Sequence, residues 1–147
     1  MATECSMTYY LSEALAKHVT QNIPFTSPTE NWLACFTADP TKDGLLTNEI
    51  TLGGYLRQQV TWSDPEVDAE DGKMKQSNVS DIEFPQATAN WDGEVTHGGI
   101  IDADEAGNML FKGEFEVHKT ITEDDIFRIP AGELQLIWDI PEEESSS

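Results

Sequence analysis

Basic residues are scarce in this 147-residue chain. Eight lysines and arginines stand against 28 aspartates and glutamates, which gives a formal net charge of −20. Proteins bind nucleic acids and anionic membranes by replacing counterions with Lys and Arg, so we expect neither kind of partner. Three interpretations of the acidity stay open: a saline setting, a solubility device, and a partner that carries a basic patch.

Cysteines and long apolar runs are equally sparse. The two cysteines, Cys5 and Cys35, exclude a disulfide framework and a zinc-finger spacing, and Cys35 is expected to be a small buried hydrophobe. No apolar run reaches the length of a membrane span, and the N-terminal sequence MATECSMTYY lacks the basic start of a secretory signal. We therefore expect a soluble protein that is not exported.

Motifs of catalysis are also missing. The three histidines, His18, His97 and His118, have no metal-ligand spacing, and the chain contains no GxSxG, Walker A or CxxC motif. His97 precedes Gly98 and Gly99, and we interpret it as a strand-end histidine bonded to a neighbouring carbonyl. The sequence predicts a protein that is not an enzyme and holds no cofactor.

What the sequence does contain is a hairpin, THGGIIDADEAGNMLFKGEF at 96–115, in which two strand-like arms flank an acidic turn. On the second arm Met109, Phe111, Phe115 and Val117 alternate with polar neighbours. A period of two is typical of a strand with one buried face.

Further strands are indicated by alternating or wholly apolar runs between turn residues, at 32–37, 53–62, 79–84, 94–101, 109–117, the end of 121–128, and 133–140. The acidic stretch 63–75 is typical of an exposed loop. Internal repeats are absent. The sequence predicts a mainly β fold, an antiparallel β-sandwich or barrel with one N-terminal α-helix.

The single predicted helix carries an apolar stripe, and Ser6 is placed to cap it while Pro24 prevents its continuation. We expect this stripe to lie against the sheet or against a neighbouring subunit, as an interface. Its members are Met7, Tyr10, Leu11, Ala14, Leu15 and Val19.

Three regions follow from composition. Residues 1–5 are expected to be an N-terminal arm, residues 6–140 a single β-rich domain with its helix, and residues 141–147 (PEEESSS) an acidic C-terminal tail too polar to fold alone.

Residue types suggest two candidate binding sites. Asp102, Asp104 and Asn108 partly match a calcium loop, but Ala106 and Gly113 stand where that pattern needs ligands. A hairpin turn closed by Asx hydrogen bonds explains them more simply, so we predict no metal. The tryptophans could form a sugar platform, although core packing is the usual role of such residues; they are Trp32, Trp62, Trp91 and Trp138.

With its helix and these segments, the chain resembles a family of small tailed-bacteriophage virion proteins, often described as tail fibre proteins. The resemblance spans about residues 7–140. It rests on LACFTADPT (33–41), GGYLRQQVTW (53–62), EFPQATANW (83–91), VTHGGIIDADEAGNMLFKG (95–113) and IFRIPAGEL (126–134). It implies a β-rich fold and no catalytic residues.

The resemblance also implies a non-enzymatic structural protein of the virion, assembled in the host cytoplasm. A globule of this size is too short to build a fibre alone, so capsid decoration is favoured, with weak contacts multiplied over the head lattice. The expected partners are further copies of itself, in a homo-oligomer such as a trimer, and the major capsid protein or tail proteins. The alternative is a tail fibre or tail-tip receptor-binding module that exposes Trp62, Trp91 and the loop 63–76.

Overall fold

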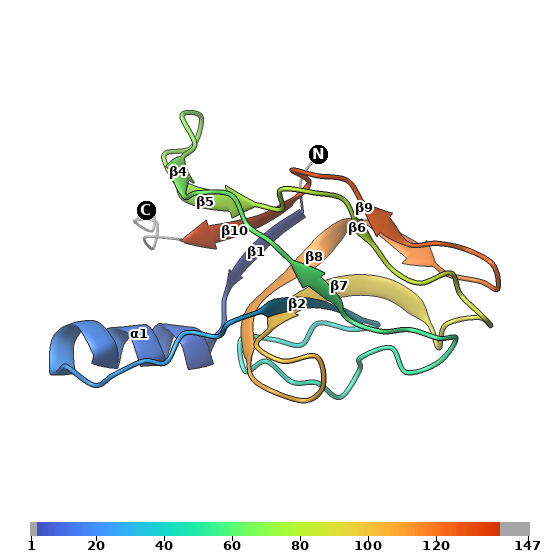
Figure 1. Ribbon diagram of the computed structural model, residues 1–147, viewed down its shortest axis with the longest axis horizontal. Helices are drawn as coiled ribbons and strands as arrows, with labels where there is room; N and C mark the ends of the chain where they lie inside the picture. Colours follow the sequence, from blue (N-terminus) through green and yellow to red (C-terminus); the bar gives the residue numbers. More distant parts are fainter. Residues whose placement is uncertain (1–2, 139–147) are drawn as a thin grey trace, which may run out of the picture.

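The protein is organised around one curled sheet that wraps around the core (Figure 1). The computed structural model describes residues 3–138. The sheet is built from β1 (Thr3–Met7), β2 (Asn31–Phe36), β3 (Gln58–Val60), β4 (Glu66–Val67), β5 (Met74–Ser77), β7 (Glu94–Ile101), β8 (Met109–Thr120) and β10 (Leu134–Trp138).

Its strand order is β3-β2-β7-β8-β1-β10-β5-β4, and β6 (Ile82–Glu83) and β9 (Arg128–Ile129) form a separate pair. One helix, α1 (Tyr9–Gln21), lies within the described residues. The predicted mainly β fold with an N-terminal helix is confirmed. One pair departs from the antiparallel expectation, because β1 and β10 run parallel.

The N-terminal strand β1 was missed by the sequence prediction. Thr3, Glu4 and Cys5, expected in an arm, are instead paired with β10, and Ser6 and Met7 are paired with β8. Thr3 and Cys5 point into the protein, as alternating residues of a strand do. The prediction of an arm is therefore wrong for residues 3–5, while residues 1–2 and the predicted tail 141–147 lie outside the described part.

The helix begins two residues later than Ser6 would place it. Thr8 is its N-cap: the Thr8 Oγ1 accepts the Leu11 N–H at 3.4 Å and lies 2.6 Å from the Met109 carbonyl, to which it donates. Asn22 ends the helix in the left-handed conformation, with φ 57°, two residues before Pro24.

The central hairpin is confirmed as β7 and β8, which pair with Gly98 opposite Gly113. A Cβ on Gly113 would lie 2.3 Å from the Glu4 carbonyl oxygen, so glycine allows β1 to pack closely against β8. Aromatic side chains fill the core beneath this sheet, with ring centroids 5.3–6.2 Å apart; they are Tyr55, Phe84, Trp91, Phe115 and Phe127.

Several predicted strands are shorter in the structure. Only residues 58–60 of the run 53–62 form a strand, because Gly53 and Gly54 adopt positive φ and Arg57 turns inward. The run 79–84 is reduced to β6. The expected loop 63–75 is in part a hairpin, formed by β4 and β5.

No helix among residues 3–138 has the length and apolar character needed to cross a membrane.

Candidate functional site

The helix and the segment that returns from it to the sheet form an extension of the β-body. We call residues 9–29 the helical projection; Figure 1 shows it reaching away from the sheet. Leu11 is buried, and the half-buried Leu15 and Phe25 pack against the core. Toward its tip the projection lacks such support, since Val19 is 78% exposed and Ile23 is also exposed.

The six predicted interface residues are split by this arrangement. Leu11 belongs to the core, and Met7 lies in β1 rather than in the helix. Ala14 and Leu15 are half-buried beside the body. Only Tyr10 and Val19 are exposed. Sequence reasoning missed Tyr9, 61% exposed, and Ile23; an N-cap placed at Thr8 would have identified Tyr9 as the first helical residue.

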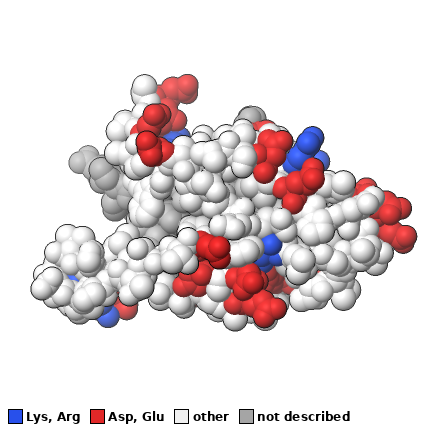
Figure 2. Space-filling view, in the orientation of Figure 1, with Lys and Arg blue, Asp and Glu red and all other residues white. Residues whose placement is uncertain are grey.

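Charge is distributed unevenly between the projection and the body. Glu13 and Lys17 are the only Asp, Glu, Lys or Arg residues between 5 and 29, and they pair with each other at 3.2 Å. Their charges cancel, so the formal charge of −20 lies wholly outside this stretch. Figure 2 shows the same contrast, with red carboxylates gathered over the body and a mostly white projection.

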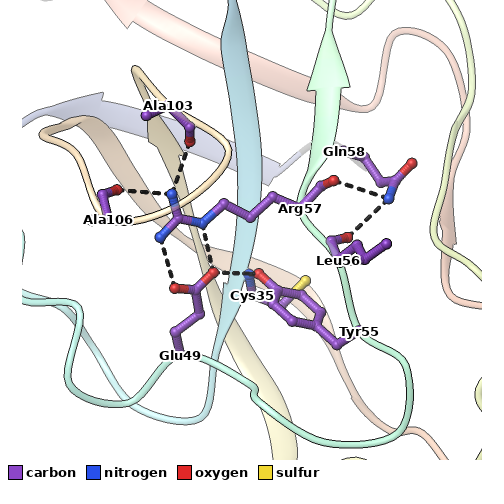
Figure 3. Close-up of polar contacts among 8 residues, drawn as sticks. All are labelled: Cys35, Glu49, Tyr55, Leu56, Arg57, Gln58, Ala103 and Ala106. Carbon is purple, nitrogen blue, oxygen red and sulfur yellow. Dashed lines mark hydrogen bonds and ion pairs between the residues drawn. The ribbon is translucent and has the colours of Figure 1, made fainter.

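A buried cluster of polar side chains lies at the turn of the β7–β8 hairpin (Figure 3). Arg57 is 6% exposed, and its Nη1 donates to the carbonyls of Ala103 and Ala106, each at 2.8 Å. Its Nε and Nη2 donate to the two carboxylate oxygens of Glu49. Burial opposes the charged form, but Glu49 outweighs it, so the pKa of Arg57 is raised.

Tyr55 completes this polar cluster. Its hydroxyl donates to Glu49 at 2.7 Å and accepts the Cys35 N–H at 2.9 Å. Burial is the main cause of the raised pKa of Tyr55; Glu49 acts in the same direction, and the hydrogen bond from the Cys35 N–H opposes it. These hydrogen bonds join β2 and the segment 49–57 to the hairpin turn, so the cluster stabilises the fold.

The calcium candidates lie in this same turn. The Asp102 carboxylate accepts the Asn108 N–H at 2.8 Å and its Nδ2 at 3.3 Å, which closes the turn as an Asx motif. The carbonyls of the turn bind the Arg57 guanidinium. Among residues 3–138 no group of three His, Cys, Asp or Glu side chains is placed to hold a metal ion, and Asp104 does not join Asp102 in one.

An open groove of about 610 Å³ lies between β8 and the segment around β9. Its ionisable side chains are Glu116, Lys119, Arg128 and Glu133, and no ion pair joins any two of them in the described chain. Apolar side chains make up the rest of the wall, Phe115, Val117, Ile126, Phe127 and Ile129 among them. The groove therefore combines both charge signs with apolar surface.

The histidines have separate partners. His97 Nδ1 lies 2.8 Å from the Thr96 hydroxyl, so its neighbour is not the expected carbonyl. Burial lowers the pKa of His97. His118 pairs with Glu114, and His18 lies at the end of the helix, 3.2 Å from the Ile23 carbonyl.

The tryptophans do not form a common exposed platform. Trp91 is buried in the aromatic core, which contradicts the expectation that a receptor-binding module would expose it. Trp62 is half-buried and packs against the core, and Trp138 packs on Phe111 with ring centroids 5.0 Å apart. Core packing is the role that the geometry shows for these three rings, while Trp32 is half-buried in β2.

A curled β-body with a sparsely charged helical projection defines the chain as a mainly β protein. Comparison with protein families identifies it further: the chain belongs to the family described as podophage GP4 fiber I protein gp80, whose model matches residues 6–137. This confirms the expected membership of a small tailed-phage virion family, and the chain is a structural protein of a phage virion. No curated protein matches it.

Proposed function

We propose that this chain is a non-enzymatic subunit of a virion fibre, joined to its neighbours through the helical projection. The description of its family as a fibre protein supports the location. The exposed, nearly uncharged projection supports the mode of attachment. The body then acts as a rigid unit that the projection positions on the particle.

The energetics of the helix carry this proposal. Helices shorter than about 12–15 residues are marginal in water unless an apolar face is packed. α1 has 13 residues, yet only its first turns contact the sheet through Leu11 and Leu15. Tyr9, Val19 and Ile23 remain exposed, so a neighbouring protein that covers them would stabilise the helix and bury apolar surface.

Capsid decoration is the second candidate. It is supported by the single compact body and by the absence of internal repeats, because a fibre shaft needs repeats or many modules. In this role the acidic body faces solvent while the projection contacts the head lattice. The major capsid protein is then the partner, in place of fibre and tail proteins.

Copy number and location test both roles. Quantitative mass spectrometry of purified virions should show a small number of copies per particle for a fibre, and amounts close to those of the major capsid protein for decoration. Electron microscopy with a label on this protein should place it on an appendage. Its absence from purified virions would refute the proposal in both forms.

The proposal that the protein is not an enzyme is tested separately. Hydrolysis assays across glycans with the purified protein should show no turnover. Turnover that is lost in a His97→Ala variant with an unchanged melting temperature would overturn it.

A further inference from the structure

We infer that the helical projection binds the helical projection of a second copy of this chain. The inference rests on the proposed function, because it names the partner of the attachment surface described above. A contact of this type is isologous: the same patch lies on both sides of the interface.

Charge restricts where two copies can meet. Each copy carries −20 in total, and like charges brought together at an interface cost several kcal/mol. The stretch 5–29 contributes no net charge, since Glu13 is neutralised by Lys17. The projection is thus a surface through which copies can approach without placing carboxylates against carboxylates.

The exposed apolar residue on the edge of the sheet lies in acidic surroundings. Val67 on the edge strand β4 is exposed, but Glu66 and Asp68 flank it, and Glu70 and Asp71 follow in the same hairpin. Lys75 pairs with Asp68 and Asp71, but strand pairing between two β4 edges would still bring Glu66 and Glu70 of both copies together. The edge is therefore protected against self-pairing in the way that charged edge strands usually are.

The projection also has the apolar surface that association requires. Tyr9, Val19 and Ile23 are exposed, and Tyr9 and Val19 lie within about 80° of each other around the helix axis, whereas Tyr10 is on the side opposite Val19. Tyr is enriched at interfaces because it combines a large apolar ring with a hydroxyl that can stay hydrated. Covering these residues would also support the distal turns of α1, which the sheet does not contact.

The test measures self-association of the purified full chain by sedimentation velocity at protein concentrations of about 1–200 μM. We expect reversible association that strengthens when NaCl rises from about 0.05 M to 0.5 M, because salt screens the residual repulsion between the bodies. Association through acidic and basic patches would weaken over the same range.

Two double variants locate the surface. Val19→Lys with Ile23→Lys should weaken association at least about tenfold. Because both substitutions reduce the net negative charge, greater overall repulsion cannot explain the loss. Leu56→Lys with Val79→Lys is the matched control: these side chains are 65% and 52% exposed on the body, and we expect unchanged association. Circular dichroism checks that each variant is folded.

The outcomes separate this inference from the proposed function. A wild-type chain that is monomeric throughout, or a control pair that weakens association as much as the projection pair does, overturns self-association. If the monomeric chain still enters virions and the projection variant does not, the projection binds a different virion protein and only the inference fails. If the chain is absent from virions, the proposed function fails whatever the association state.

Discussion

Arg57 and Glu49 form a two-point ion pair, in which Nε lies 2.7 Å from Oε2 and Nη2 lies 2.8 Å from Oε1. The same guanidinium holds the carbonyls of Ala103 and Ala106, so one buried cation links the segment before β3 to the turn of the β7–β8 hairpin. The positions of the strands around this turn depend on that link.

The first prediction concerns this pair. Arg57→Met should lower the free energy of unfolding by about 3–5 kcal/mol, because it leaves the Glu49 carboxylate and two carbonyls without their donor. Urea denaturation followed by tryptophan fluorescence measures the change. Lys17→Met removes the exposed pair with Glu13 and should cost no more than about 1 kcal/mol. Equal losses in the two variants would contradict the structural role of Arg57.

The inward position of Arg57 shows where sequence reasoning stops. In the run GGYLRQQVTW the alternation assigns Arg57 to the polar face opposite Leu56, Gln58 and Val60, yet Leu56 is exposed and Arg57 is buried. Burying a charge is unfavourable unless the charge is paired and hydrogen-bonded. The partners of Arg57 are Glu49 and two hairpin carbonyls, and these come from other parts of the chain. No local pattern carries that information.

The period-two pattern predicted strands correctly where burial of one sheet face alone determines the structure. The hairpin arms and the last strand alternate and were predicted close to their observed bounds, since one face of each is buried. β1 was missed because TECSM is short and polar, and its pairing with β10 joins the two ends of the chain. The helix was found, but the division of its stripe between core and solvent depends on how far the helix extends past the sheet.

The second prediction concerns pH. Burial raises the pKa of the Cys5 thiol from 9.0 to about 12, with Lys112 lowering it and Glu4 raising it to a smaller extent. The folded protein therefore favours the neutral thiol, and this contribution is complete below pH 9 and is lost as pH rises toward 12. The free energy of unfolding should fall by roughly 1 kcal/mol between pH 8 and pH 10 from this group.

Cys5→Ala isolates the effect. The cavity it leaves costs stability equally at both pH values, so the difference between pH 8 and pH 10 reports the thiol alone. That difference should be smaller in Cys5→Ala than in the wild type, as measured by urea denaturation at each pH. An identical difference in the two proteins would show that the thiol does not titrate with unfolding.

The third prediction concerns the close approach of β1 to β8. In Gly113→Ala the new Cβ would meet the Glu4 carbonyl at 2.3 Å and the Cys5 Cα at 3.0 Å, and backbone cannot move aside cheaply. We expect a loss of at least about 2 kcal/mol in the free energy of unfolding. Gly93→Ala is the control, because its Cβ would meet only the Thr37 side chain, which can rotate. Similar melting temperatures for both variants would contradict the tight β1–β8 contact.

The last prediction concerns calcium at the hairpin turn. A ligand that binds only the folded state raises the melting temperature, but here the turn carbonyls already bind Arg57 and the Asp102 carboxylate already accepts two hydrogen bonds from Asn108. Calcium should therefore raise the melting temperature no more than magnesium does at equal concentration, since both ions only screen the acidic surface. Asp102→Asn should lower the melting temperature equally with calcium and with chelator. A calcium-specific rise that Asp102→Asn abolishes would instead establish a metal site in the turn.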